Sequence, residues 1–153
     1  MERYHATDDR PVSYPGREGH KRPRVDIEVI LCKGMRPLFH FECKRLGEGN
    51  PVGKYLGDDG LGCFLTEQYA RECGEGGMLA YVQSDACASW ASKIASSMLA
   101  ERSKYRIQAG TTWESYAIIE ELPDCFRTLH TRPSLGPITI YHSFLLFYEP
   151  SAS

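Results

Sequence analysis

Two segments of alternating polarity, joined by a short stretch with a glycine and a proline, constrain the fold of this chain most strongly. Residues 25–31 (VDIEVIL) and 39–44 (FHFECK) alternate apolar with charged or polar side chains. A period of two is the pattern of a half-buried β-strand. The connecting residues 32–37 include Gly34, which tolerates positive φ, and Pro37, which lacks an N–H group. The sequence therefore predicts a β-hairpin with one polar and one apolar face.

The register of this hairpin brings acidic side chains together. If the turn centres on Gly34, Asp26 lies opposite Glu42, and Glu28 lies opposite His40. Directly opposed residues of an antiparallel pair have Cβ atoms about 4.5–5.5 Å apart, and like charges in that position destabilise a sheet. A divalent cation bound between Asp26 and Glu42 would remove the repulsion.

The expected ligands are hard oxygen donors. The carboxylates of Asp26 and Glu42, with the carbonyl of Cys43, suit Mg²⁺ or Mn²⁺, which favour near-octahedral oxygen coordination and retain several waters. Lys44 lies on the same face of the strand, beside the expected metal. The alternative interpretation is an edge hairpin whose charged face meets solvent.

An aspartate at the start of one strand and Glu-x-Lys on the next, sixteen residues later, carries a family resemblance. The chain resembles the PD-(D/E)xK nuclease superfamily, with Val25-Asp26 in place of Pro-Asp and Glu42-Cys43-Lys44 as the (D/E)xK motif. The resemblance implies an α/β, restriction-endonuclease-like fold, a mixed β-sheet flanked by helices. It also implies that Asp26 and Glu42 hold the metal, while Lys44 helps to activate the attacking water and neutralises developing charge.

The order of later elements agrees with this resemblance, which covers about residues 24–104. A continuous apolar run predicts a buried strand beside the Glu-x-Lys strand, and an apolar stripe at helical spacing predicts the long helix that follows. A glycine-rich stretch predicts a mobile loop. The expected elements are a loop over 47–62, a short helix over 64–74, a strand over 77–82, a helix over 86–104, and strands over 113–119, 125–131 and 138–148.

Residues 1–23 contain three prolines and many charges without a helical or alternating apolar pattern, which predicts an irregular N-terminal arm. Residues 24–153 are expected to form a single nuclease-like domain. The superfamily core usually begins with a helix that often brings a further acid to the metal. No such helix is visible in this sequence.

Composition excludes some classes of protein and leaves nucleic acid as a candidate partner. The chain has 153 residues, no apolar run near the roughly 20 residues of a membrane span, and no apolar leader segment, so a cytoplasmic protein is expected. Without a secretion signal, we expect the cysteines to be reduced thiols. Their spacing contains no C-x₂-C pair, so we expect no structural zinc site. The net charge of −2 requires any nucleic-acid surface to be local. Basic residues around the hairpin supply the candidates: Arg17, Lys21, Arg22, Arg24, Lys33, Arg36, Lys44, Arg45 and Lys54.

Three functions are therefore compared. The first is a Mg²⁺-dependent endo- or exodeoxyribonuclease, acting alone, as a homodimer or within a larger protein complex. The second is a catalytically inactive protein of the same fold that binds a partner, for example in a defence or anti-defence complex. The third is a metal-independent ribonuclease that uses His130, Arg132 and His142.

Overall fold

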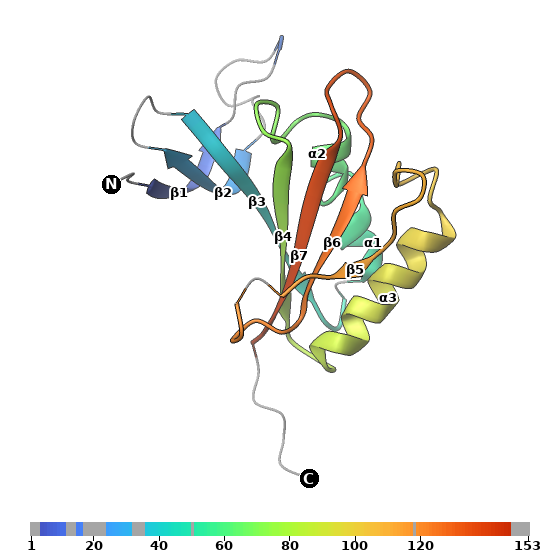
Figure 1. Ribbon diagram of the computed structural model, residues 1–153. Coiled ribbons are helices and arrows are strands. Elements are labelled where there is room, and N and C mark those ends of the chain that lie inside the picture. The colour runs from blue at the N-terminus through green and yellow to red at the C-terminus, as the bar shows by residue number, and fades with distance from the viewer. Residues whose placement is uncertain are drawn as a thin grey trace.

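In the computed structural model, the described residues (4–11, 15–16, 24–31, 36–49, 51–117 and 119–147) form a seven-stranded open sheet with helices packed against it (Figure 1). The protein is thus a mixed α/β protein, as the sequence predicts. Its elements are β1 (Tyr4–Pro11), β2 (Arg24–Leu31), β3 (Arg36–Leu46), α1 (Val52–Leu56), α2 (Gly62–Leu65), β4 (Glu75–Val82), α3 (Cys87–Ala100), β5 (Glu114–Ser115), β6 (Cys125–His130) and β7 (Ile138–Leu146).

The predicted hairpin is strands β2 and β3. They pair antiparallel with Ile27 opposite Phe41 and Glu28 opposite His40, which confirms the expected register. The register shifts between Val29 and Ile30, where a bulge places one extra residue in β3. The expected turn at Gly34 falls outside the described residues.

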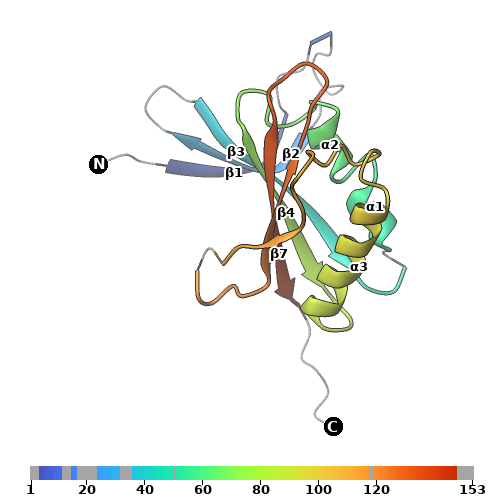
Figure 2. The same ribbon diagram turned by 45° about the vertical axis from the view of Figure 1, so that its right-hand side comes forward.

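Two parallel pairings build the centre of the sheet. The strand order is β1-β2-β3-β4-β7-β6-β5, and β4 pairs parallel with both β3 and β7. Parallel neighbours need crossover connections, here made by α1 with α2 and by α3 with β5 and β6. The helices lie on one face of the sheet, as Figure 2 shows from a second direction.

The hydrophobic core lies between this face and the helices. Even-numbered residues of the central strands point inward because successive strand side chains alternate. Helix α3 contributes an apolar stripe, as its periodicity predicts. Members of the core include Leu46, Met78, Ala80, Val82, Ile140 and Phe144 from the strands and Trp90, Ile94 and Met98 from α3.

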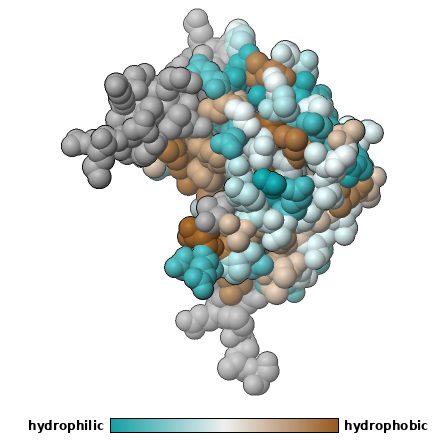
Figure 3. Space-filling view, in the orientation of Figure 1, coloured by the Kyte–Doolittle hydropathy of each residue, from teal (hydrophilic) through white to brown (hydrophobic). Residues whose placement is uncertain are grey.

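Aromatic side chains line the opposite face of the sheet. The Phe39 and Phe41 rings lie 4.6 Å apart, and Phe39 also approaches Tyr141 at 6.1 Å. Gly77 permits this arrangement, since a Cβ atom there would lie 2.4 Å from the Phe41 ring. Figure 3 shows the recess on this side of the molecule, with apolar colour along its wall. Aromatic rings therefore shield a face that carries no helix in the described part of the chain.

The N-terminal arm is a correction to the sequence prediction. Residues Tyr4–Pro11 form β1 and pair antiparallel with β2 from Tyr4 opposite Leu31 to Pro11 opposite Arg24. Its sequence, YHATDDRP, has no apolar alternation, and β1 is an edge strand of the sheet, where charged residues hinder unwanted pairing. Backbone hydrogen bonds to β2 define it. The rest of the predicted arm lies outside the described residues, apart from Pro15 and Gly16.

Two further expectations need revision. The glycine-rich loop over 47–62 contains α1, which is anchored by the fully buried Tyr55. The helix expected over 64–74 is one turn, α2, followed by turns in which Glu67 and Ala70 have positive φ. Glu67 stabilises these turns, since its carboxylate accepts the N–H groups of Ser134 and Leu135.

The remaining elements agree with prediction except at their ends. Strands β4, β6 and β7 and helix α3 are confirmed, whereas the strand expected over 113–119 is only the two residues of β5. In the described residues, no helix is long and apolar enough to cross a membrane. The cysteines of the described segments are free thiols, as expected, and Cys32 lies outside these segments.

Candidate functional site

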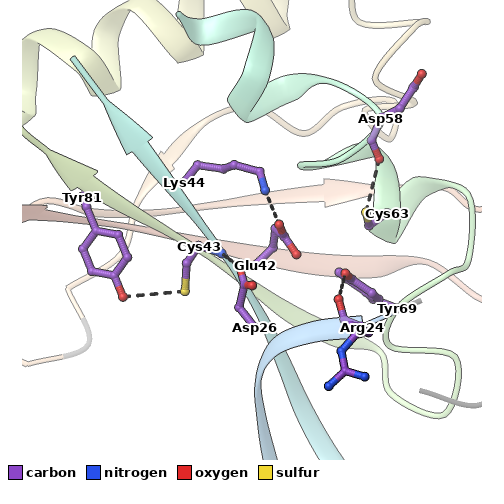
Figure 4. A network of polar contacts seen from close by, with 9 residues as sticks. All are labelled: Arg24, Asp26, Glu42, Cys43, Lys44, Asp58, Cys63, Tyr69 and Tyr81. Carbon is purple, nitrogen blue, oxygen red and sulfur yellow. Dashed lines mark hydrogen bonds and ion pairs between the residues drawn. The ribbon is translucent and has the colours of Figure 1, made fainter. Parts of the chain in front are cut away.

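The candidate site lies where β2 and β3 separate. Their pairing ends at Ile27 and Phe41, while β3 continues beside β4 to Leu46. Asp26 and Glu42 are the next residue of each strand beyond the last pair. Figure 4 shows Asp26, Glu42 and Lys44 gathered at this point.

Asp26 takes the place of a ladder partner for β3. Its Oδ2 accepts the backbone N–H of Cys43 at 2.7 Å. The N–H and C=O of one residue in an extended strand point to the same side. The carbonyl of Cys43 is therefore directed toward the same edge of β3 as Asp26. The three predicted oxygen donors, Asp26, Glu42 and the Cys43 carbonyl, converge on one region of the strand.

Glu42 is buried and forms an ion pair with Lys44, the lysine of the Glu-x-Lys motif. Only 5% of Glu42 is exposed, and Lys44 Nζ donates to its Oε1. Burial raises the pKa of Glu42 to about 7, against the lowering effect of Lys44 and with further raising by the charge of Asp26. Near neutral pH Glu42 is thus present in both its protonated and its ionised form, whereas an exposed glutamate is ionised.

Two side chains from the segment after β3 cover Glu42. Tyr69 and Cys63 are both buried, and Tyr69 donates its hydroxyl hydrogen bond to the carbonyl of Arg24. Burial, and then the negative charge of Glu42, raise the pKa of Tyr69 above its ordinary value and that of Cys63 to about 12. Tyr69 thus links β2 to the turn after α2 and closes the site on the helical side.

Glu28 and His40 form a separate, buried pair. His40 Nδ1 accepts the Ala70 N–H at 2.9 Å, so Nε2 carries the proton and donates to Glu28 Oε1 at 3.1 Å. Burial lowers the pKa of His40, which favours this neutral form. Both ring nitrogens are engaged, and His40 is a neighbour of the expected metal ligands, as the sequence interpretation holds.

A cleft of about 580 Å³ opens beside the acidic residues. Asp26 and Lys44 line it, whereas Glu42 lies behind them. The cleft has three basic side chains and one carboxylate in its wall. Its lining residues are Asp26, Ile27, Cys43, Lys44, Arg45, Lys54 and Tyr81.

The donor set fits a hard divalent cation. Mg²⁺ is usually held by one or two carboxylates with waters and substrate oxygens, and Asp26 and Glu42 each have a second carboxylate oxygen beyond the contacts described above. Among the described residues, no group of three His, Cys, Asp or Glu side chains is arranged to hold a metal ion. A cation here would therefore rest on two carboxylates, a backbone carbonyl and water.

Other polar residues of the neighbouring segments do not join the candidate site. Gln68 bonds to Thr66 Oγ1, and Tyr55 is buried against His142 rather than available to a phosphate. Asp58 and Asp59 are exposed in a turn. Glu2, Glu18 and the basic residues Arg17, Lys21, Arg22 and Lys33 are outside the described residues.

The histidines of the third functional interpretation are buried. His130 and His142 have no exposed surface, and Thr128 Oγ1 contacts Nε2 of both rings at 2.6 and 2.8 Å. Arg132 donates to the carbonyls of Gly136 and Ala70. A solvent-facing acid–base pair made of these histidines is therefore wrong, and their role is structural.

Tyr69 and Tyr81 also contribute to the candidate site, and neither is among the site residues that the sequence predicts. The parallel pairing that sets Arg45 beside Tyr81 would have identified the second residue. The first depends on the turns after α2, for which the sequence carries no local signal.

Comparison of this chain with protein-family models, with curated proteins and with solved structures finds no match.

Proposed function

We propose that this protein is a metal-dependent nuclease that hydrolyses phosphodiester bonds on a restriction-endonuclease-like fold. The observation that carries the proposal is the meeting of Asp26, Glu42 and Lys44 where β2 and β3 separate. The chain order of β3, helix, β4 and helix supports it. DNA is the favoured substrate through the family resemblance alone.

Asp26, Glu42 and the carbonyl of Cys43 would hold the Mg²⁺ or Mn²⁺ ion. When bound, the ion supplies Lewis-acid stabilisation and a water of lowered pKa. The Cys43 N–H orients the Asp26 carboxylate, so the ligand needs little rearrangement. Lys44 lines the cleft and holds a positive charge where a phosphate oxygen gains negative charge during in-line attack.

A second function, a catalytically inactive binding protein of the same fold, is favoured by one observation. Lys44 is paired with Glu42, and Glu42 lies behind the cleft wall. A closed ion pair of this kind can replace a metal as the partner of a buried carboxylate. The two functions differ in one requirement, because only the nuclease needs a divalent cation.

The test is cleavage of supercoiled plasmid and of circular single-stranded DNA in Mg²⁺, in Mn²⁺ and in EDTA. We expect cleavage in either metal, no cleavage in EDTA, and loss of cleavage in Lys44→Ala. Lys104→Ala is the matched control, since Lys104 is an exposed lysine paired with Glu101 after α3. Linear forms of both substrates are tested beside the circles, because an exonuclease needs a free end and cleaves only the linear forms. If wild-type protein binds DNA but cleaves neither the circular nor the linear forms, the inactive binding protein is the correct function.

A further inference from the structure

The cleft beside the acidic residues follows a free strand edge. Beyond Phe41 the described residues pair β3 with β4 alone, and the cleft wall combines the ends of β2 and β3 with α1 and β4. Arg45 is exposed on this part of β3, and Lys54 comes from α1. The cleft is therefore open along its length at the border of the proposed catalytic residues.

The charge of the cleft selects an anion. Lys44, Arg45 and Lys54 lie in the wall with the single carboxylate of Asp26. Because Lys44 is paired with Glu42 behind the wall, Arg45 and Lys54 supply the positive excess of this region, within a chain of net charge −2. Lys54 Nζ donates to the Gly49 carbonyl at 3.2 Å, which holds its ammonium near the cleft. Local positive charge of this kind tracks the phosphates of nucleic acid.

An aromatic pair borders the same cleft. Tyr81 lies beside Arg45 in the parallel register and donates its hydroxyl hydrogen bond to Cys43 Sγ at 3.7 Å. The Phe147 ring meets Tyr81 edge to face at 4.9 Å and is 62% exposed, although its backbone N–H is fixed to the Val82 carbonyl at 2.8 Å. Tyr81 therefore lines the cleft, and the exposed Phe147 ring packs against Tyr81 just outside the lining residues.

Resting on the proposed function, we infer that this cleft binds an unpaired, single-stranded stretch of nucleic acid, with phosphates at Arg45 and Lys54 and a base against Tyr81 and Phe147. Proteins that bind single strands combine a basic groove with aromatic rings on which bases stack. In a duplex the base faces are stacked inside, and only base edges are accessible in the grooves. A volume of about 580 Å³ is in the range of clefts that enclose small ligands, which suits an unstacked nucleotide rather than a duplex.

The test measures binding of a fluorescent single-stranded oligodeoxynucleotide and of the duplex of the same sequence, in EDTA, by fluorescence anisotropy. We expect the single strand to bind more tightly. Tyr81→Ala and Phe147→Ala should each weaken its binding by about 5- to 100-fold. Tyr81→Phe retains the ring, so it should bind like wild type. Arg45→Ala and Lys54→Ala should each lower the salt dependence by about one unit of slope, and Lys104→Ala should change nothing.

The outcomes separate this inference from the proposed function. Duplex binding equal to or tighter than single-strand binding, or unchanged affinity in both Tyr81→Ala and Arg45→Ala, overturns the single-strand cleft even if metal-dependent cleavage is observed. Single-strand binding that depends on Tyr81 and Arg45, in a protein that never cleaves with any metal, supports the cleft and rejects the nuclease. Asp26→Asn should abolish cleavage, because Asp26 is a proposed metal ligand, and should not weaken binding in EDTA, because it removes the one carboxylate of the cleft wall.

Discussion

Two buried polar clusters of this protein differ in whether their groups satisfy one another. Between β6 and β7, the His130 Nδ1–H donates to the Tyr105 carbonyl, so Thr128 donates to His130 Nε2 and accepts from His142 Nε2–H. This series of hydrogen bonds ends with the Tyr55 hydroxyl, which donates to His142 Nδ1. Every side chain in the series is neutral and has a hydrogen-bond partner.

At the ends of β2 and β3, the polar groups are charged and unequal in number. Lys44 is paired with Glu42, whereas Asp26 accepts the Cys43 N–H, and burial, with a smaller contribution from the charge of Asp26, raises the pKa of Glu42 to about 7. A matched neutral network stabilises a core, whereas a buried group with repelling neighbours costs stability and often has a function. The histidine cluster therefore has the character of a structural network, and the acidic cluster is the one for which we propose chemistry.

The largest expected effect is on catalysis at the acidic cluster. Lys44→Ala removes the positive charge that faces the reacting phosphate, and we expect a loss of about 10²–10³ in the cleavage rate. Plasmid cleavage in Mg²⁺, with Thr128→Ser as a variant of the other cluster that keeps its hydroxyl, measures the difference. A cleavage rate of Lys44→Ala within a factor of two of wild type would remove the assigned role of the lysine.

The histidine cluster should show the opposite behaviour, with an effect on stability alone. Thr128→Val keeps the side-chain shape but leaves both histidine Nε2 atoms without a partner, and we expect a loss of about 2–4 kcal/mol in the free energy of unfolding. Urea denaturation measures this, with the exposed Thr131→Val as control, which should change stability by less than about 0.5 kcal/mol. A small effect of Thr128→Val would show that the chain of hydrogen bonds contributes little.

Acid should weaken the protein through the histidine cluster. Burial lowers the pKa of His130 to about 4 and that of His142 well below its usual range. The unfolded chain therefore binds more protons below pH about 6.5, and stability falls as pH drops from there toward 4. His130 alone should account for about 2 kcal/mol between pH 8 and pH 5. Urea denaturation over this range measures the loss, and a flat profile would contradict the neutral buried state.

An effect of opposite sign belongs to Glu42. Its raised pKa means that the folded protein binds the proton more tightly, so metal-free stability falls as pH rises from about 4.5 through 7. Glu42→Gln keeps the shape without the charge. In urea denaturation in EDTA, we expect the free energy of unfolding of Glu42→Gln, relative to wild type, to be higher at pH 8 than at pH 5 by about 2 kcal/mol. Equal stability of wild type and Glu42→Gln at both pH values would show that burial does not destabilise the ionised form of Glu42.

Sequence reasoning succeeded where short-range pattern determines structure. The β2–β3 register follows from alternation and a single turn, and it places Asp26 and Glu42 at neighbouring strand positions. The sequence does not predict strand β1, because residues 4–11 show no alternation of apolar and polar side chains. Helix α1 was missed because its glycine-rich surroundings conceal one buried anchor, Tyr55.

The burial of the Glu42 side chain could not be predicted from the sequence of β3. It depends on Tyr69 and Cys63, which the positive-φ turns after α2 bring over the sheet. Such turns at Glu67 and Ala70 run against residue preference and are maintained by tertiary contacts, for example from Glu67 to the chain at Ser134. The sequence therefore predicts that the candidate residues lie close together, and it does not predict how deeply they are buried.

The most direct test of the account is a titration of metal-free protein with Mn²⁺ at pH 8, followed by calorimetry and by the melting temperature. Asp26→Asn preserves an acceptor for the Cys43 N–H but removes the charge, and the exposed Asp59→Asn is the matched control. We predict that Mn²⁺ binds and raises the melting temperature of wild type and Asp59→Asn, and does neither in Asp26→Asn. Absence of binding to wild type, or equal binding in all three proteins, would contradict a cation shared by Asp26 and Glu42.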